Sequence, residues 1–199
     1  MSLGLYLHIP YCFSKCRYCD FYSAPGQRGV PRAYVDALLR ELSRFAPDAP
    51  LRPDTLYFGG GTPSLLDPAD AARLIAAAQP LPGAEITLEA NPDVVTPENL
   101  AGFAAAGVTR ISFGVQSADD AQLRRLGRTH TVAAAAQAFA WAREAGFREI
   151  CGDIMLALPY YSIAEFDKTL ALLQAGGCTH ISAYLLKICL LYTSDAADA

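Results

Sequence analysis

Short runs rich in β-branched and aromatic residues alternate along the chain with longer segments of helical composition. The expected strands are residues 3–9, 55–58, 85–90, 110–115, 149–156 and 180–186, and the expected helices are residues 31–45, 67–78, 96–106, 119–126, 131–145 and 162–175. Strands separated by helical crossovers pair in parallel. Six strand–helix repeats therefore predict an α/β fold with parallel strands, and an incomplete (β/α)6 barrel fits them better than a doubly wound sheet does.

The composition is that of a soluble globular protein, with 52% hydrophobic residues, 18% charged residues and a formal net charge of −4 over 199 residues. A mildly acidic balance argues against a nucleic-acid partner, which normally requires a basic surface. No apolar run reaches the ~18 residues that cross a bilayer, so we expect no transmembrane segment. The first residues lack the basic flank and cleavage site of a signal peptide, and we therefore expect a cytoplasmic location.

Three of the six cysteines lie within eight residues, in the spacing C-x3-C-x2-C: Cys12, Cys16 and Cys19. Clustered cysteines in a reducing compartment typically bind metal or perform redox chemistry. A closed iron–sulfur or structural zinc site normally uses four ligands, so three thiolates leave one iron of a [4Fe–4S] cluster open to an outside ligand. The alternative is a zinc site that an outside ligand completes. Cys151 and Cys178 lie far away in the sequence and are interpreted as buried thiols.

Glycine, proline and polar residues gather where the expected strands end, at residues 12–19, 59–62, 91–92 and 116–117. In parallel α/β architectures, the active site forms at the carboxyl ends of the strands. The sequence therefore predicts one site at this edge, with the cysteines as part of it.

The residues around the cysteines resemble the radical S-adenosylmethionine (SAM) superfamily. Within it, the chain is similar to the group of oxygen-independent coproporphyrinogen III oxidases and related heme chaperones. The similar segments are YLHIPYC (6–12) with the cysteine motif, LYFGGGTP (56–63), LEANP (88–92), ISFGVQS (111–117), GDIM (152–155) and HISAY (180–184). The resemblance implies a radical SAM barrel, in which an electron from the cluster cleaves SAM to methionine and a 5′-deoxyadenosyl radical, while the protein positions the cofactor.

The resemblance also implies the ligands of both cofactors. Cys12, Cys16 and Cys19 would bind the [4Fe–4S] cluster. The SAM-contacting positions would be Tyr6, Gly60, Gly61, Thr62, Glu89, Gln116, Arg128 and Asp153. At the glycines, the absence of side chains lets backbone groups reach the methionine ammonium of SAM, and Arg128 would bind its carboxylate. A carboxylate at Glu89 would accept the ribose hydroxyls. No residue is assigned a catalytic role, and His130 is interpreted as an ordinary loop residue.

One position separates the two branches of this group. In the oxidase motif, a further cysteine follows the last cluster cysteine by two positions, and here that position is Phe21. The departure favours the heme chaperones, which bind heme and deliver it to hemoproteins. The expected partners are heme or a porphyrinogen, a recipient hemoprotein and an electron donor. The alternative is an oxidase that converts coproporphyrinogen III to protoporphyrinogen IX by oxidative decarboxylation.

The resemblance predicts a radical SAM core domain over residues 1–188. Residues 189–199 resemble translated adapter sequence and are interpreted as a non-native tail, and the C-terminal domain of the family is expected to be absent. We therefore expect the sixth strand to expose apolar surface and an unpaired backbone edge.

Overall fold

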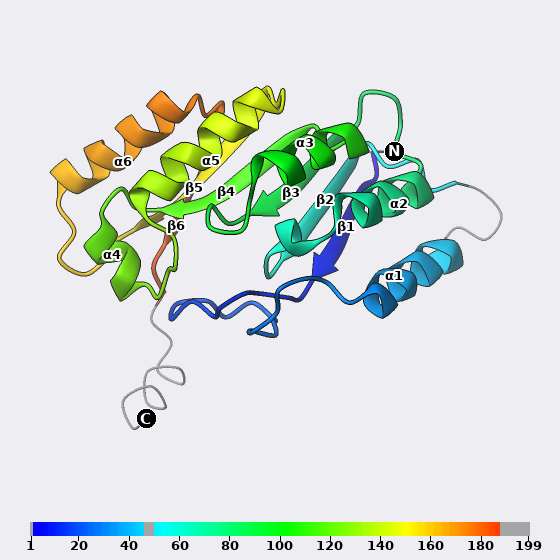
Figure 1. The fold of residues 1–199 in the computed structure, drawn as a ribbon, viewed down its shortest axis with the longest axis horizontal. Coiled ribbons are helices and arrows are strands. Elements are labelled where there is room, and N and C mark those ends of the chain that lie inside the picture. The colour runs from blue at the N-terminus through cyan, green and yellow to red at the C-terminus, as the bar shows by residue number, and fades with distance from the viewer. Residues whose placement is uncertain (1, 46–49, 188–199) are drawn as a thin grey trace.

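Six parallel strands form one sheet whose spatial order follows the chain, in a computed structural model that describes residues 2–45 and 50–187 (Figure 1). The strands are β1 (Gly4–Ile9), β2 (Thr55–Gly60), β3 (Glu85–Ala90), β4 (Arg110–Gln116), β5 (Glu149–Leu156) and β6 (His180–Leu185). A doubly wound sheet reverses its strand order at a switch point, and this order never reverses. The fold is therefore an open, incomplete barrel, as the sequence predicts.

The helices cover one face of this sheet (Figure 1). They are α1 (Arg32–Phe45), α2 (Pro68–Ala78), α3 (Pro97–Ala106), α4 (Asp120–Arg125), α5 (Val132–Glu144) and α6 (Ile163–Gly176), with a short 3-10 turn at Pro63–Leu65. Local signals set their ends. The Asp67 side chain accepts a hydrogen bond from the backbone of Ala69 at the start of α2, and Gly107 ends α3 in a left-handed conformation.

Alternation along the strands separates an apolar face from a polar face. The apolar side chains pack against the helices in the main core, and they include Leu7, Ile9, Leu56, Phe58, Leu88, Ile111, Phe113, Ile150 and Ile154. The polar face carries the residues between them, which include Tyr6, Tyr57, Glu89, Ser112, Asp153 and Ser182. The uncovered face of the sheet is therefore the one that can receive a polar ligand.

β6 forms one edge of the sheet, because β5 is its only partner among the described residues. Its side chains Ile181, Tyr184 and Leu185 are exposed, as expected from the sequence. The interpretation of residues 189–199 falls outside the described residues. Within the described ranges, none of the helices has the length and apolar character that crossing a membrane requires.

Candidate functional site

The segment between β1 and α1, residues 10–31, carries the cysteines and runs across the carboxyl end of the sheet as far as α4 (Figure 1). We call it the cysteine loop. Backbone hydrogen bonds fix it at two places: Thr62 N donates to Tyr11 O at 2.7 Å, and Arg17 N donates to Leu126 O at 3.1 Å. The loop therefore spans from the end of β2 to the end of α4.

The three clustered cysteines share this loop but differ in exposure. Cys12 is buried, whereas Cys16 and Cys19 are half-buried. Burial raises the pKa of the Cys19 thiol, while the nearby Lys15 ammonium acts in the opposite direction. Within residues 2–45 and 50–187, no three His, Cys, Asp or Glu side chains form a group that could hold a metal ion. We expect the three sulfurs to converge when a cluster is built.

Glycines at the end of β2 let the cysteine loop approach the sheet closely. A Cβ atom at Gly61 would lie 2.6 Å from Tyr11 O and 2.9 Å from Cys12 Sγ, both too close for any side chain. Gly60 has a φ of +120°, a conformation that L-residues rarely adopt. The two positions therefore require glycine for structural reasons, whatever they bind.

Two carboxyl groups lie on the polar face of the sheet, Glu89 on β3 and Asp153 on β5, with β4 between them. Glu89 accepts hydrogen bonds from the Tyr57 hydroxyl at 2.9 Å and from Gly60 N at 3.1 Å. Asp153 accepts one from the Ser112 hydroxyl at 3.1 Å. Burial raises the pKa of both carboxyls, because removal from water disfavours their charged forms. The two carboxyl groups would favour a ligand that brings hydroxyl or cationic groups to this face of the sheet.

Tyr6 lies at the opposite edge of the polar face, on β1. Its ring stacks on Tyr57 with centroids 6.0 Å apart, and its hydroxyl lies 3.1 Å from His8 Nδ1. The other ring nitrogen of His8 lies 3.0 Å from Tyr22 O, so both nitrogens have partners. Tyr6 is nevertheless 53% exposed, which leaves one face of its ring open to a ligand.

Arg128 is the most connected of the predicted site residues. Its Nη2 donates to Asn91 Oδ1 at 2.7 Å and to Gly114 O at 2.6 Å, and its Nη1 donates to Cys16 Sγ at 3.4 Å. Asn91 in turn donates to the Thr62 hydroxyl at 3.1 Å. These contacts join the ends of β2, β3 and β4 to the cysteine loop.

The predicted residues thus fall into groups rather than one cluster. Arg128, Thr62 and Cys16 share one network, and Gln116 lies beside it with a φ of 68° at an irregularity in the pairing of β4. Glu89 and Gly60 form a second group, and Asp153 contacts Ser112 on β4, Cys151 on β5 and Ser182 on β6. Sequence reasoning assigned no site role to Asn91 or His130. The position of Asn91 at a strand end was the available signal.

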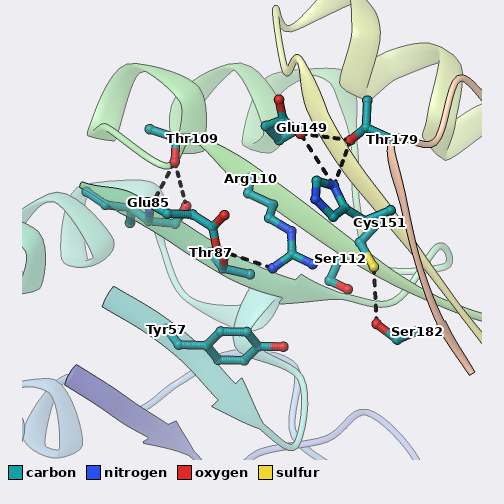
Figure 2. A network of polar contacts seen from close by, with 12 residues as sticks. Tyr57, Glu85, Thr87, Thr109, Arg110, Ser112, Glu149, Cys151, Thr179 and Ser182 are labelled. Carbon is teal, nitrogen blue, oxygen red and sulfur yellow. Dashed lines mark hydrogen bonds and ion pairs between the residues drawn. The ribbon is translucent and has the colours of Figure 1, made fainter. Parts of the chain in front are cut away.

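Further polar contacts lie near the starts of the strands (Figure 2). Arg110 pairs with Glu85 at 3.3 Å, and the Cys151 sulfur lies 3.2 Å from the Ser182 hydroxyl. Cys151 is fully buried, as expected for a structural thiol. A separate cavity of about 370 Å³ lies between the cysteine loop and the first turns of α2 and α3, and no predicted site residue lines it.

Replacing Glu89 with glutamine tests how much the buried, charged carboxylate lowers the free energy of unfolding. Because the pKa of Glu89 is raised in the folded protein, the free energy of unfolding falls as pH rises from the ordinary value of 4.5 through the folded value. We expect Glu89→Gln to melt at a higher temperature than the ligand-free parent protein at pH 7. The difference should disappear below about pH 4, where both states hold the proton. Thermal melts across pH, with exposed Glu144→Gln as control, check this; a lower melting temperature at pH 7 would contradict it.

Comparison with known proteins agrees with this geometry. The sequence model of the radical SAM superfamily matches residues 6–173. The heme chaperone HemW of Escherichia coli (strain K12) is 41% identical over 192 residues, which cover 94% of this chain and 51% of the chaperone. The radical S-adenosyl methionine domain-containing protein 1, mitochondrial, of Bos taurus is 38% identical over 195 residues, which cover 93% of this chain and 43% of that protein.

A solved structure supports the same assignment. Coproporphyrinogen III oxidase (HemN) from Escherichia coli, a radical SAM enzyme, superposes with a TM-score of 0.86 at 28% identity, covering 97% of this chain and 46% of that one. The chain spans about half the length of the relatives that it matches. From the matched residues and the open parallel barrel, we conclude that the chain belongs to the radical SAM superfamily.

Proposed function

We propose that this chain is the radical SAM core of a heme chaperone, which binds heme and delivers it to hemoproteins. The observation that carries the proposal is Phe21, which stands where the oxidase motif has a further cysteine. Its side chain is exposed and its carbonyl accepts a hydrogen bond from Lys15 Nζ at 2.6 Å, so this position serves the loop through its backbone. The 41% identity to HemW, against 28% to HemN, supports the same branch.

The donor set fits an iron–sulfur cluster. Cys12, Cys16 and Cys19 supply soft sulfur ligands from one loop, and the guanidinium of Arg128 contacts one of them at 3.4 Å. A zinc module is not favoured, since the superfamily implies a [4Fe–4S] cluster and SAM. Bound together, these cofactors supply one-electron cleavage of a sulfonium bond.

We propose that SAM lies along the carboxyl ends of β1 to β5, on the residues named from the sequence. The backbone at Gly60 and Gly61, together with Thr62, would receive the methionine part. Glu89 would accept the ribose hydroxyls, and Tyr6 offers an aromatic face at the open edge. Gln116, Arg128 and Asp153 would complete the site from β4, the loop after α4, and β5. Each would bind or orient the cofactor and exclude water.

The proposal extends to partners and location. Heme or a porphyrinogen, a recipient hemoprotein and an electron donor are the expected partners, and the cytoplasm is the expected location. These statements concern the whole protein. The core, as proposed, supplies the cluster and the SAM site.

The branch is tested with protein reconstituted anaerobically with iron and sulfide. One arm titrates heme and then adds an apo-hemoprotein; saturable binding followed by transfer is expected. The other arm supplies coproporphyrinogen III, SAM and a reductant; no protoporphyrinogen IX is expected. Formation of protoporphyrinogen IX would contradict the chaperone function and support the oxidase function. A colourless protein that holds zinc in place of iron would overturn both.

A further inference from the structure

The guanidinium of Arg128 is held on several sides. An arginine has five N–H donors in a planar fork, and here donors on all three nitrogens reach acceptors: Asn91 Oδ1, Gly114 O, Cys16 Sγ and His130 Nδ1. The first two contacts orient one end of the fork. The orientation of the guanidinium also depends on its Nε atom, which donates to His130 Nδ1 at 3.4 Å.

His130 is suited to accept this proton. It lies in the loop after α4, is 4% exposed, and has its Nε2 atom 3.2 Å from Val115 O. A carbonyl oxygen can only accept, so the ring proton belongs on Nε2, which leaves Nδ1 free to accept from Arg128. Burial, followed by the charge of Arg128, lowers the pKa of His130 to about 4, while Asp93 and Asp120 act in the opposite direction. The imidazole is therefore neutral at pH 7.

We propose that His130 is a positioning residue, which fixes the Arg128 guanidinium against the Cys16 sulfur and thereby holds the cysteine loop on the end of β4. This role of His130 rests on the proposed function in one respect, that Cys16 is a cluster ligand, and it does not depend on heme.

The expected consequence is electrochemical. Hydrogen bonds to the ligand sulfurs and nearby charge set the reduction potential of iron–sulfur clusters. A cation that donates to Cys16 stabilises the reduced, more negative state and raises the potential. If the guanidinium turns away, the potential should fall.

Three variants separate this role from simple packing. His130→Leu removes the acceptor, His130→Asn returns an oxygen at the position of Nδ1, and His180→Leu removes an exposed histidine on β6 as the control. In protein with equal iron and sulfide content, we expect His130→Leu to make reduction at least tenfold less favourable, a fall of about 59 mV for one electron. His130→Asn should restore most of the lost reduction potential, and His180→Leu should leave the potential unchanged. An unchanged potential in His130→Leu, or an equal fall in His130→Asn, would overturn the proposal.

A second measurement needs no cluster and no variant. Imidazole ¹⁵N shifts of the unsubstituted chain report which ring nitrogen of His130 carries the proton. We expect protonated Nε2 and an acceptor-type Nδ1 between about pH 6 and 8. A proton on Nδ1 would exclude the contact with Arg128, even if His130→Leu failed to fold. Because neither heme nor a porphyrinogen takes part, this result is independent of the test of heme delivery.

Discussion

Cys16→Ala is expected to lose nearly all iron and inorganic sulfide after anaerobic reconstitution. Two thiolates would leave two of the four irons without a protein ligand, which is too few to hold a cluster that uses three cysteines in this type of site. Cys16 is also the cysteine that Arg128 contacts, so the substitution removes a ligand and leaves the guanidinium without its sulfur acceptor. The measurement is iron and sulfide content per chain, together with the visible chromophore.

Cys151→Ala is the matched control for that experiment. Cys151 is fully buried on β5 and contacts the Ser182 hydroxyl, far along the sequence from the cysteine loop. We expect it to retain the full complement of iron and sulfide, even if its melting temperature falls. An unchanged iron content in Cys16→Ala, or an equal loss of iron in both variants, would show that Cys16 is not a cluster ligand. The proposed coordination by three cysteines would then be wrong.

Gly61→Ala is expected to lower the affinity for SAM by about a hundredfold, the order of loss in rate that a misplacement of about 1 Å can cause at an active site. The added methyl group would meet Tyr11 O at 2.6 Å and Cys12 Sγ at 2.9 Å. Backbone cannot yield as the end of a flexible side chain does, so the cysteine loop must move away from β2. Equilibrium binding of SAM to cluster-loaded protein measures the effect, and the iron content reports whether the cluster is lost as well.

The control for this substitution is Gly29→Ala, in the same loop. A Cβ atom at Gly29 has Leu65 O as its nearest neighbour, at 3.9 Å, which is ordinary contact. We expect Gly29→Ala to bind SAM as the parent protein does. If Gly61→Ala also bound SAM normally, the close approach of loop and strand would be irrelevant to the cofactor.

The fold could be predicted from the sequence because its signals are local. Residues 85–90 and 149–156 form strands over the expected ranges, and Asp67 begins α2 and Gly107 ends α3 where capping chemistry indicates. Most other strand and helix ends differ from expectation by one residue, and the largest departure among the strands is at β2. β2 continues to Gly60, two residues beyond expectation, because Gly59 and Gly60 remain paired with His8 and Ile9 on β1. Strand pairing, which no single segment reveals, overrode the low strand propensity of glycine.

The site could be predicted only in part. Residue types at strand ends indicated where it lies, and the resemblance named the cysteines and Arg128. Which side chains meet could not be inferred, because Arg128 reaches Asn91 and Cys16 across long sequence separations. The sequence indicates an ordinary loop residue at His130, and it does lie in a loop. Its burial and its contact with Arg128 depend on how α4 and β4 pack, which composition does not encode.

The contact between Cys16 and Arg128 also has a consequence for biosynthesis, because 112 positions separate the two residues. At about 5–20 residues per second, a ribosome needs on the order of 10 s to translate that stretch. During that interval the nascent polypeptide carries the Cys16 thiol without the guanidinium that later contacts it. We therefore expect stalled nascent chains to retain less iron while Arg128 is still inside the exit tunnel than after it has emerged.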